Sequence, residues 1–170
     1  MTAPHPPIIG IAGRSGVGKT TFLETLLPEI KRRGYRVGTI KHHAHPGFEI
    51  DQPGKDTWRH AQAGSDHVVI AAPDRVASIR RVDADPPLSA IAATMTDVDL
   101  ILTEGYGRAP IPKLELVRAA LSAEPICDPQ HVVGYVTDCA LASSIPCLAF
   151  EDVRAVADLI EAFVAERARN

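Results

Sequence analysis

Eight consecutive residues follow the pattern G-x-x-x-x-G-K-[ST], whose glycine-rich backbone holds the phosphates of a nucleotide in many proteins. They are Gly13, Arg14, Ser15, Gly16, Val17, Gly18, Lys19 and Thr20, and we add Thr21, the next residue, to the predicted nucleotide-binding set. Backbone N–H groups of such a loop point at the phosphates, and the positive end of the following helix adds to the attraction. We expect Lys19 to neutralise charge on the β- and γ-phosphates and the hydroxyl of Thr20 to hold Mg²⁺.

A phosphate loop also needs an acid that orders Mg²⁺ and its water, and Glu104 is the best candidate. It follows an apolar run over 98–103 that has the composition of a buried parallel strand. Ligands of open α/β sheets bind at the carboxyl ends of the strands, where we expect Glu104, whereas Asp99 begins the same run and lies at the opposite edge. The alternative is that Glu104 is a solvated loop acid.

The polar segment 41–56 leaves the carboxyl end of another predicted strand. It contains His42, His43, His45 and several acids, among them Asp51. An anion-binding or substrate loop is the preferred interpretation, in which Asp51 orients Mg²⁺-bound water or a nucleophile. We therefore place Asp51 in the catalytic set with Lys19 and Glu104, and in the Mg²⁺ set with Thr20 and Glu104. A transition-metal site on the imidazoles and a plain exposed loop remain alternatives.

Asp138 closes a late apolar run, again at the predicted carboxyl edge of the sheet. A carboxylate in that position can accept hydrogen bonds from N1–H and the 2-amino group of guanine, which adenine lacks. Asp138 is therefore a candidate for reading the base. The alternative is an aspartate that ends a strand or caps a helix.

The bulk composition is that of an ordinary globular protein. A length of 170 residues suits one nucleotide-binding domain over 1–170 with a short disordered lead at 1–6. A net charge of −3 argues against nucleic-acid binding, and no apolar run approaches the length that spans a bilayer. The three cysteines, Cys127, Cys139 and Cys147, are typical of reduced thiols in a cytoplasmic protein.

Alternating strand and helix patterns surround the loop. The predicted strands lie at 7–12, 35–41, 67–72, 75–82, 98–103, 113–117, 132–137 and 147–150, and the predicted helices follow the loop from 21 and cover 55–63, 88–95 and 152–167. Alternation predicts that the strand at 113–117 is half exposed, and Pro73-Asp74 predicts a hairpin between the strands on either side. Together these elements predict a three-layer α/β P-loop NTPase fold with a mostly parallel central sheet and a β-hairpin extension.

Three blocks of the sequence together resemble the molybdopterin-guanine dinucleotide biosynthesis protein B family. They are GIAGRSGVGKTT (10–21), IKHH (40–43) with FEIDQPGKDTWR (48–59) and AGS (63–65), and DLILTEGY (99–106) with PKLELVR (112–118). The first block is shared by many nucleotide-binding proteins, whereas the second and third are far more specific. One departure is Gly107, where the family often has Lys; Arg108 follows and could supply the charge.

The resemblance implies a GTP-binding homodimer that acts as an adapter. Its partner would be the molybdenum cofactor guanylyltransferase, which joins GMP to molybdopterin, and molybdopterin itself could be a second partner. GTPase activity in such proteins is weak, so the resemblance implies at most a slow, Mg²⁺-dependent GTP hydrolysis. The loop residues, Glu104 and Asp51 carry over from the family by their positions in these blocks, and Asp138 carries over by the Thr137-Asp138 pair that accompanies them.

Two other functions fit the same residues. A small-molecule kinase would use GTP or ATP as donor and the histidine-rich segment as its acceptor site. A metallochaperone-type GTPase would use His42, His43 and His45 to carry a metal ion. The first would turn over rapidly only with an added metabolite, and the second would bind Zn²⁺ or Ni²⁺ stoichiometrically.

Overall fold

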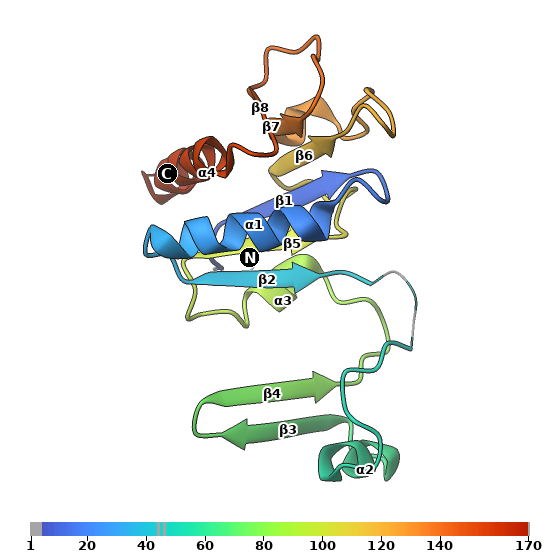
Figure 1. Cartoon of the computed structure of the whole chain (residues 1–170). Helices are drawn as coiled ribbons and strands as arrows, with labels where there is room; N and C mark the ends of the chain where they lie inside the picture. The colour runs from blue at the N-terminus through green and yellow to red at the C-terminus, as the bar shows by residue number, and fades with distance from the viewer. Residues whose placement is uncertain (1–4, 44, 46, 170) are drawn as a thin grey trace. The chain divides into compact units, whose positions relative to one another are not determined.

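The computed structural model describes residues 5–43, 45 and 47–169, and they fall into two units (Figure 1). The larger unit consists of Met1–Ala44 and Ser89–Asn170, and the smaller of His45–Leu88. Of the lead expected over 1–6, residues 1–4 lie outside the described part. That 1–170 behaves as a single domain stays a prediction.

A six-stranded sheet forms the centre of the larger unit, and every pairing between its neighbouring strands is parallel. In sheet order, the strands are β2 (Val37–Lys41), β5 (Leu100–Glu104), β1 (Ile8–Gly13), β6 (Lys113–Val117), β7 (Val132–Thr137) and β8 (Cys147–Leu148). The apolar runs of β1 and β5 are buried because strands and helices cover them on all sides. The mostly parallel sheet predicted from the sequence is confirmed.

Helices pack on this sheet and complete the three-layer α/β fold (Figure 1). They are α1 (Lys19–Arg32), α3 (Leu88–Ala92) and α4 (Val153–Arg169), with a 3-10 turn at Pro129–His131. Helix α1 buries Phe22, Leu26 and Ile30, which recur at helical spacing, against the strands. It ends before Gly34, whose φ of +94° favours glycine. No described helix is long and apolar enough to span a bilayer.

An ion cluster joins α1 to α4. The carboxylate of Glu29 accepts hydrogen bonds from Arg32 at 2.7 Å and from Arg33 at 2.9 Å. Arg33 also contacts Asp158 at 2.6 Å and Glu161 at 2.5 Å on α4. The bonds from the two arginines lower the pKa of Glu29 to about 2. The carboxyl-terminal end of α1 is therefore linked to α4 by charge as well as by apolar packing.

The strand β6 corrects one expectation, because all five of its residues are buried rather than alternately exposed. Lys113 donates hydrogen bonds to the carbonyls of Ala109 and Ile111, at 2.5 and 2.9 Å. The carboxylate of Glu115 accepts from the backbone N–H groups of Ile126 at 2.5 Å and Cys127 at 3.2 Å. The alternating polar residues are thus covered by neighbouring loops, whose backbone groups satisfy them.

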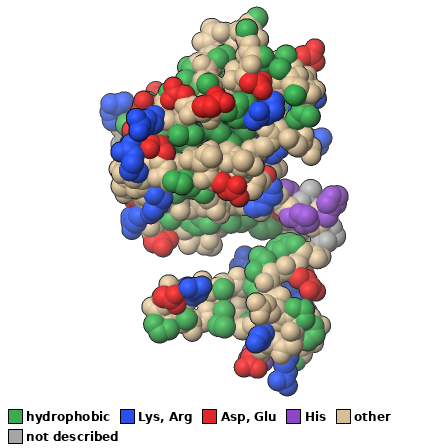
Figure 2. Space-filling model, viewed as in Figure 1, with side chains coloured by type: hydrophobic (Ala, Val, Ile, Leu, Met, Phe, Trp, Pro, Cys, Tyr) green, Lys and Arg blue, Asp and Glu red, His purple; other side chains and the backbone are tan. Residues whose placement is uncertain are grey.

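The smaller unit contains α2 (Asp56–Gln62) and the antiparallel pair β3 (His67–Ala72) and β4 (Arg75–Arg80), which confirms the predicted hairpin. Among the described residues of this unit, Val68 alone has a buried side chain. Apolar side chains are therefore exposed on its surface (Figure 2). They are Phe48, Ile50, Val69, Ile70, Val76, Ile79 and Val82.

Candidate nucleotide-binding site

The predicted phosphate loop connects the end of β1 to the start of α1. Three of its glycines have positive φ, namely Gly13 at +134°, Gly16 at +78° and Gly18 at +96°. A Cβ atom on Gly13 would lie 2.5 Å from the carbonyl oxygen of Leu116. A Cβ atom on Gly16 or Gly18 would have no atom within 4 Å. Glycine is therefore required for backbone conformation at all three positions, and at Gly13 also for close approach to β6.

The ammonium of Lys19 is directed back onto the loop. It donates hydrogen bonds to the carbonyls of Gly13 at 3.0 Å and Arg14 at 2.9 Å. Desolvation lowers the pKa of Lys19, an effect that the carboxylate of Glu104 opposes and the charge of Lys41 reinforces. The predicted phosphate-binding cation thus lies within the loop, close enough to Glu104 and Lys41 to feel both charges.

Glu104 lies beside the first turn of α1. It is the last residue of β5 rather than a residue after it, and it is only 7% exposed, so it is not a solvated loop acid. The hydroxyl of Thr20 donates to its carboxylate at 3.1 Å, and Lys41 from the end of β2 forms an ion pair with it. The structure therefore brings together Lys19, Thr20 and Glu104, as the strand-edge rule predicts.

Asp138 follows β7, and its carboxylate forms a hydrogen bond and an ion pair with nearby groups. One oxygen accepts the backbone N–H of Ala119 at 2.7 Å, and the other lies 3.6 Å from the guanidinium of Arg118. Asp138 is not among the residues that line the cavity beside the phosphate loop. Its contacts fix Arg118 and the backbone turn after β6.

The cavity beside the loop has a volume of about 510 Å³. Gly16, Val17, Gly18, Thr21, Phe22, Thr25, Arg118, Phe150, Glu151 and Val153 line it. The rings of Phe22 and Phe150 meet edge to face, with centroids 6.1 Å apart, and the guanidinium carbon of Arg118 lies 4.1 Å from the Phe150 centroid. Sequence reasoning did not find Phe150 or Glu151, because no motif surrounds them.

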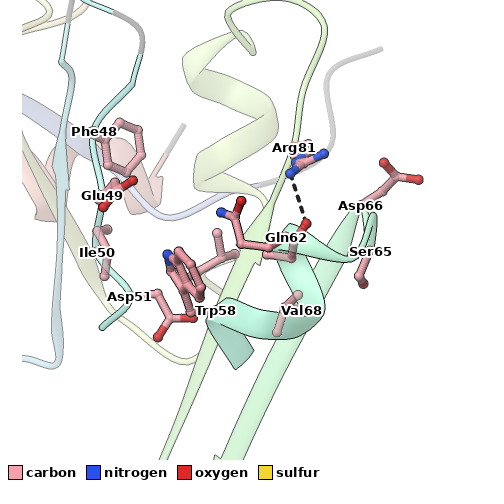
Figure 3. A pocket seen from close by; sticks show the side chains of 12 residues that line it. Phe48, Glu49, Ile50, Asp51, Trp58, Gln62, Ser65, Asp66, Val68 and Arg81 are labelled. Carbon is pink, nitrogen blue, oxygen red and sulfur yellow. Dashed lines mark hydrogen bonds between the residues drawn. The ribbon is translucent and has the colours of Figure 1, made fainter. Parts of the chain in front are cut away.

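Asp51 belongs to the smaller unit, where it lines a second pocket (Figure 3). This pocket, of about 130 Å³, also contains Phe48, Trp58 and Arg81, and Arg81 donates to the Ala61 carbonyl at 3.0 Å. The carboxylate of Asp51 accepts from the backbone of Gln52 at 2.8 Å and from the Thr57 hydroxyl at 3.1 Å. A role for Asp51 with Mg²⁺ stays a prediction.

The histidine-rich segment contributes His42 to the larger unit. The ring of His42 lies 4.9 Å from that of Tyr106, and its backbone N–H donates to the carbonyl of Glu104 at 2.8 Å. A Cβ atom on Gly105, which has a φ of +97°, would lie 2.7 Å from the carbonyl oxygen of His42. Within the described ranges, no group of three His, Cys, Asp or Glu side chains could hold a metal ion.

Comparison with known proteins matches the model of molybdopterin guanine dinucleotide synthesis protein B to residues 8–138. A molybdopterin-guanine dinucleotide biosynthesis adapter protein of Haemophilus influenzae is 37% identical over 158 residues, covering 91% of this chain and 88% of the relative. Its Escherichia coli namesake is 33% identical over 160 residues, covering 91% of each chain. A crystal structure of molybdopterin-guanine biosynthesis protein B superposes with a TM-score of 0.72 at 26% identity, covering 93% of this chain and 99% of that one. The chain belongs to the molybdopterin guanine dinucleotide synthesis protein B family.

Proposed function

We propose that this chain binds Mg²⁺-GTP at the phosphate loop and acts as an adapter in molybdenum cofactor biosynthesis. In this role it assists the guanylyltransferase that attaches GMP to molybdopterin. The observation that carries the nucleotide part is the grouping of Lys19, Thr20 and Glu104 beside a glycine loop with the required backbone conformation. The adapter part is supported by the names of the curated relatives.

The oxygen atoms beside the loop fit a magnesium ion. The Thr20 hydroxyl lies 3.1 Å from the Glu104 carboxylate, and hydroxyl and carboxylate oxygens are the hard ligands that Mg²⁺ prefers. Thr20 and Glu104 would hold the ion, which would supply positive charge to neutralise phosphate oxygens. Lys41 pairs with Glu104 and fixes the direction of its carboxylate.

The chain's own residues position phosphates rather than activate water. Loop N–H groups and Lys19 compensate phosphate charge, which is most of what phosphoryl transfer requires. The carboxylate of Glu104 is already engaged by Lys41 and by the Thr20 hydroxyl, so it is not placed to activate an attacking water. Slow GTP hydrolysis follows from this arrangement and suits an adapter.

We further propose that the chain is a cytoplasmic homodimer. The three free cysteines are consistent with a reducing compartment. The exposed apolar side chains of the smaller unit support assembly, because a two-stranded hairpin that buries little surface is marginally stable on its own. The guanylyltransferase and molybdopterin are the other proposed partners.

The test of nucleotide binding is calorimetric titration with GTP and with ATP in Mg²⁺. Lys19→Ala should abolish GTP binding while its far-UV circular dichroism stays unchanged. Lys31→Ala is the matched control, because Lys31 is an exposed lysine in the last turn of the same helix. Equal affinity of Lys19→Ala and the unsubstituted chain would contradict the phosphate-loop assignment. Preference for ATP, with rapid turnover on an added metabolite, would instead favour the small-molecule kinase.

A further inference from the structure

The cavity beside the loop is the space into which a nucleoside would extend from phosphates held there. Gly16, Gly18 and Thr21 line it from the phosphate loop and the first turn of α1. Its volume of about 510 Å³ lies within the usual range of small-molecule sites. A nucleotide whose phosphates occupy the loop therefore has this cavity for its sugar and base. Any role of the cavity in base recognition rests on the proposed function, since it concerns the base of the same GTP.

Arg118 and Phe150 provide a flat platform in that cavity. The guanidinium lies over the Phe150 ring, 4.1 Å from its centroid, and is held from the side by Asp138 at 3.6 Å. Its Nε donates weakly to the Val17 carbonyl at 3.4 Å. The Arg118 side chain is 40% exposed, so part of it is accessible to a ligand in the cavity. Guanidinium planes of this kind stack on nucleobases.

Two carboxylates lie near this platform, and they differ in their hydrogen bonds and ion pairs. Both oxygens of Asp138 face protein donors, the backbone N–H of Ala119 and the guanidinium of Arg118. Glu151 lines the cavity directly after Phe150 and is exposed. In the part of the chain that the structure describes, its carboxylate forms no hydrogen bond or ion pair. Glu151 is therefore the carboxylate that is available to a ligand.

We infer that Glu151 reads the guanine ring of bound GTP, while Asp138 is a positioning residue that holds the Arg118 platform. An ionised carboxylate has two acceptor oxygens, which match N1–H and the 2-amino group of guanine. Adenine presents an acceptor at N1 and lacks the 2-amino group, so the same carboxylate repels it. The assignment makes guanine selectivity a property of the turn that precedes α4.

The test is calorimetric titration of the full chain with Mg²⁺ and four ligands: GTP, XTP, ATP and inorganic tripolyphosphate. Glu151→Gln should weaken GTP binding at least tenfold and strengthen XTP binding, because the glutamine amide donates to the 2-oxo group of xanthine. Its tripolyphosphate affinity should stay unchanged, since the phosphates bind only the loop. Glu151 is exposed, so the substitution should leave the fold intact.

Asp138→Asn is the matched comparison, since it removes the same charge from the other carboxylate. It should weaken the binding of GTP, XTP and ATP to the same extent, because Arg118 is held less firmly. The preference for GTP over XTP should remain. A switch to XTP in Asp138→Asn, or GTP affinity within twofold of the original in Glu151→Gln, overturns the inference. The inference is also overturned if the unsubstituted chain binds tripolyphosphate and shows equal affinity for GTP, XTP and ATP, a result that would still support the phosphate-loop assignment. An unsubstituted chain that binds no phosphate ligand refutes the proposed function itself, and the inference with it.

Discussion

Replacement of Gly13 by alanine tests the structural basis of the phosphate loop. At a φ of +134°, an L-residue costs roughly 1–3 kcal/mol in backbone strain. The new Cβ would also lie 2.5 Å from the carbonyl oxygen of Leu116, and that oxygen is difficult to move because Gly13 and Leu116 are paired in the register of β1 and β6. Relief by a bond-angle distortion of about 10° adds about 2 kcal/mol, so a total loss of roughly 3–5 kcal/mol is expected.

Gly16→Ala is the matched control, because Gly16 has a φ of +78° but no atom within 4 Å of its added Cβ. Its cost should be only about 1–2 kcal/mol, that of the left-handed conformation alone. Both variants would be unfolded in urea and followed by far-UV circular dichroism. With an m-value of about 2 kcal/mol/M, the midpoint of Gly13→Ala should lie roughly 1 M below that of Gly16→Ala. Midpoints within about 0.3 M of each other would refute the steric reasoning.

Two ionisable groups with perturbed pKa values provide further predictions. Because the pKa of Glu29 is lowered from 4.5 to about 2, the stability that Glu29 contributes is present above pH 4.5 and is lost as the pH falls towards 2. Urea midpoints measured across this pH window should therefore fall less steeply for Glu29→Gln than for the unsubstituted chain. Equal slopes for the two proteins would contradict the prediction. Desolvation raises the pKa of the Cys127 thiol to about 11, so at pH 8 an aromatic disulfide reagent should modify the exposed Cys147 well before Cys127. Peptide mapping of a time course would show this order of modification. Modification of Cys127 first would contradict the prediction.

The phosphate loop could be predicted because its residues are contiguous and its flanking strand and helix are local patterns. Glu104 could be predicted because parallel strands end at a common edge, so its neighbourhood with Thr20 follows from topology. The hairpin was predictable for a similar reason, since its two strands and turn lie within one short segment. In each case the information lies either along the chain or in a general rule of sheets.

The cavity beside the phosphate loop could not be predicted, because its walls come from three distant segments of the chain. Arg118 and Phe150 meet only after β6 and α4 have been placed, and no local pattern marks Glu151. The prediction that β6 is half exposed was wrong for the same reason, because the burial of Glu115 depends on backbone N–H donors more than ten residues away. Polar residues satisfied by distant backbone look exposed when only their sequence is considered.

The position of Trp58 determines what the usual optical probes report. It is the only tryptophan of the sequence and lies in the smaller unit, whereas the long helices α1 and α4 belong to the larger one. Fluorescence therefore follows 45–88, and ellipticity near 222 nm follows mainly the sheet-and-helix unit. Coincident curves from the two signals would indicate that the whole chain unfolds as one cooperative domain. A survey of loop variants by fluorescence alone would miss a weakened larger unit if the two units melt separately.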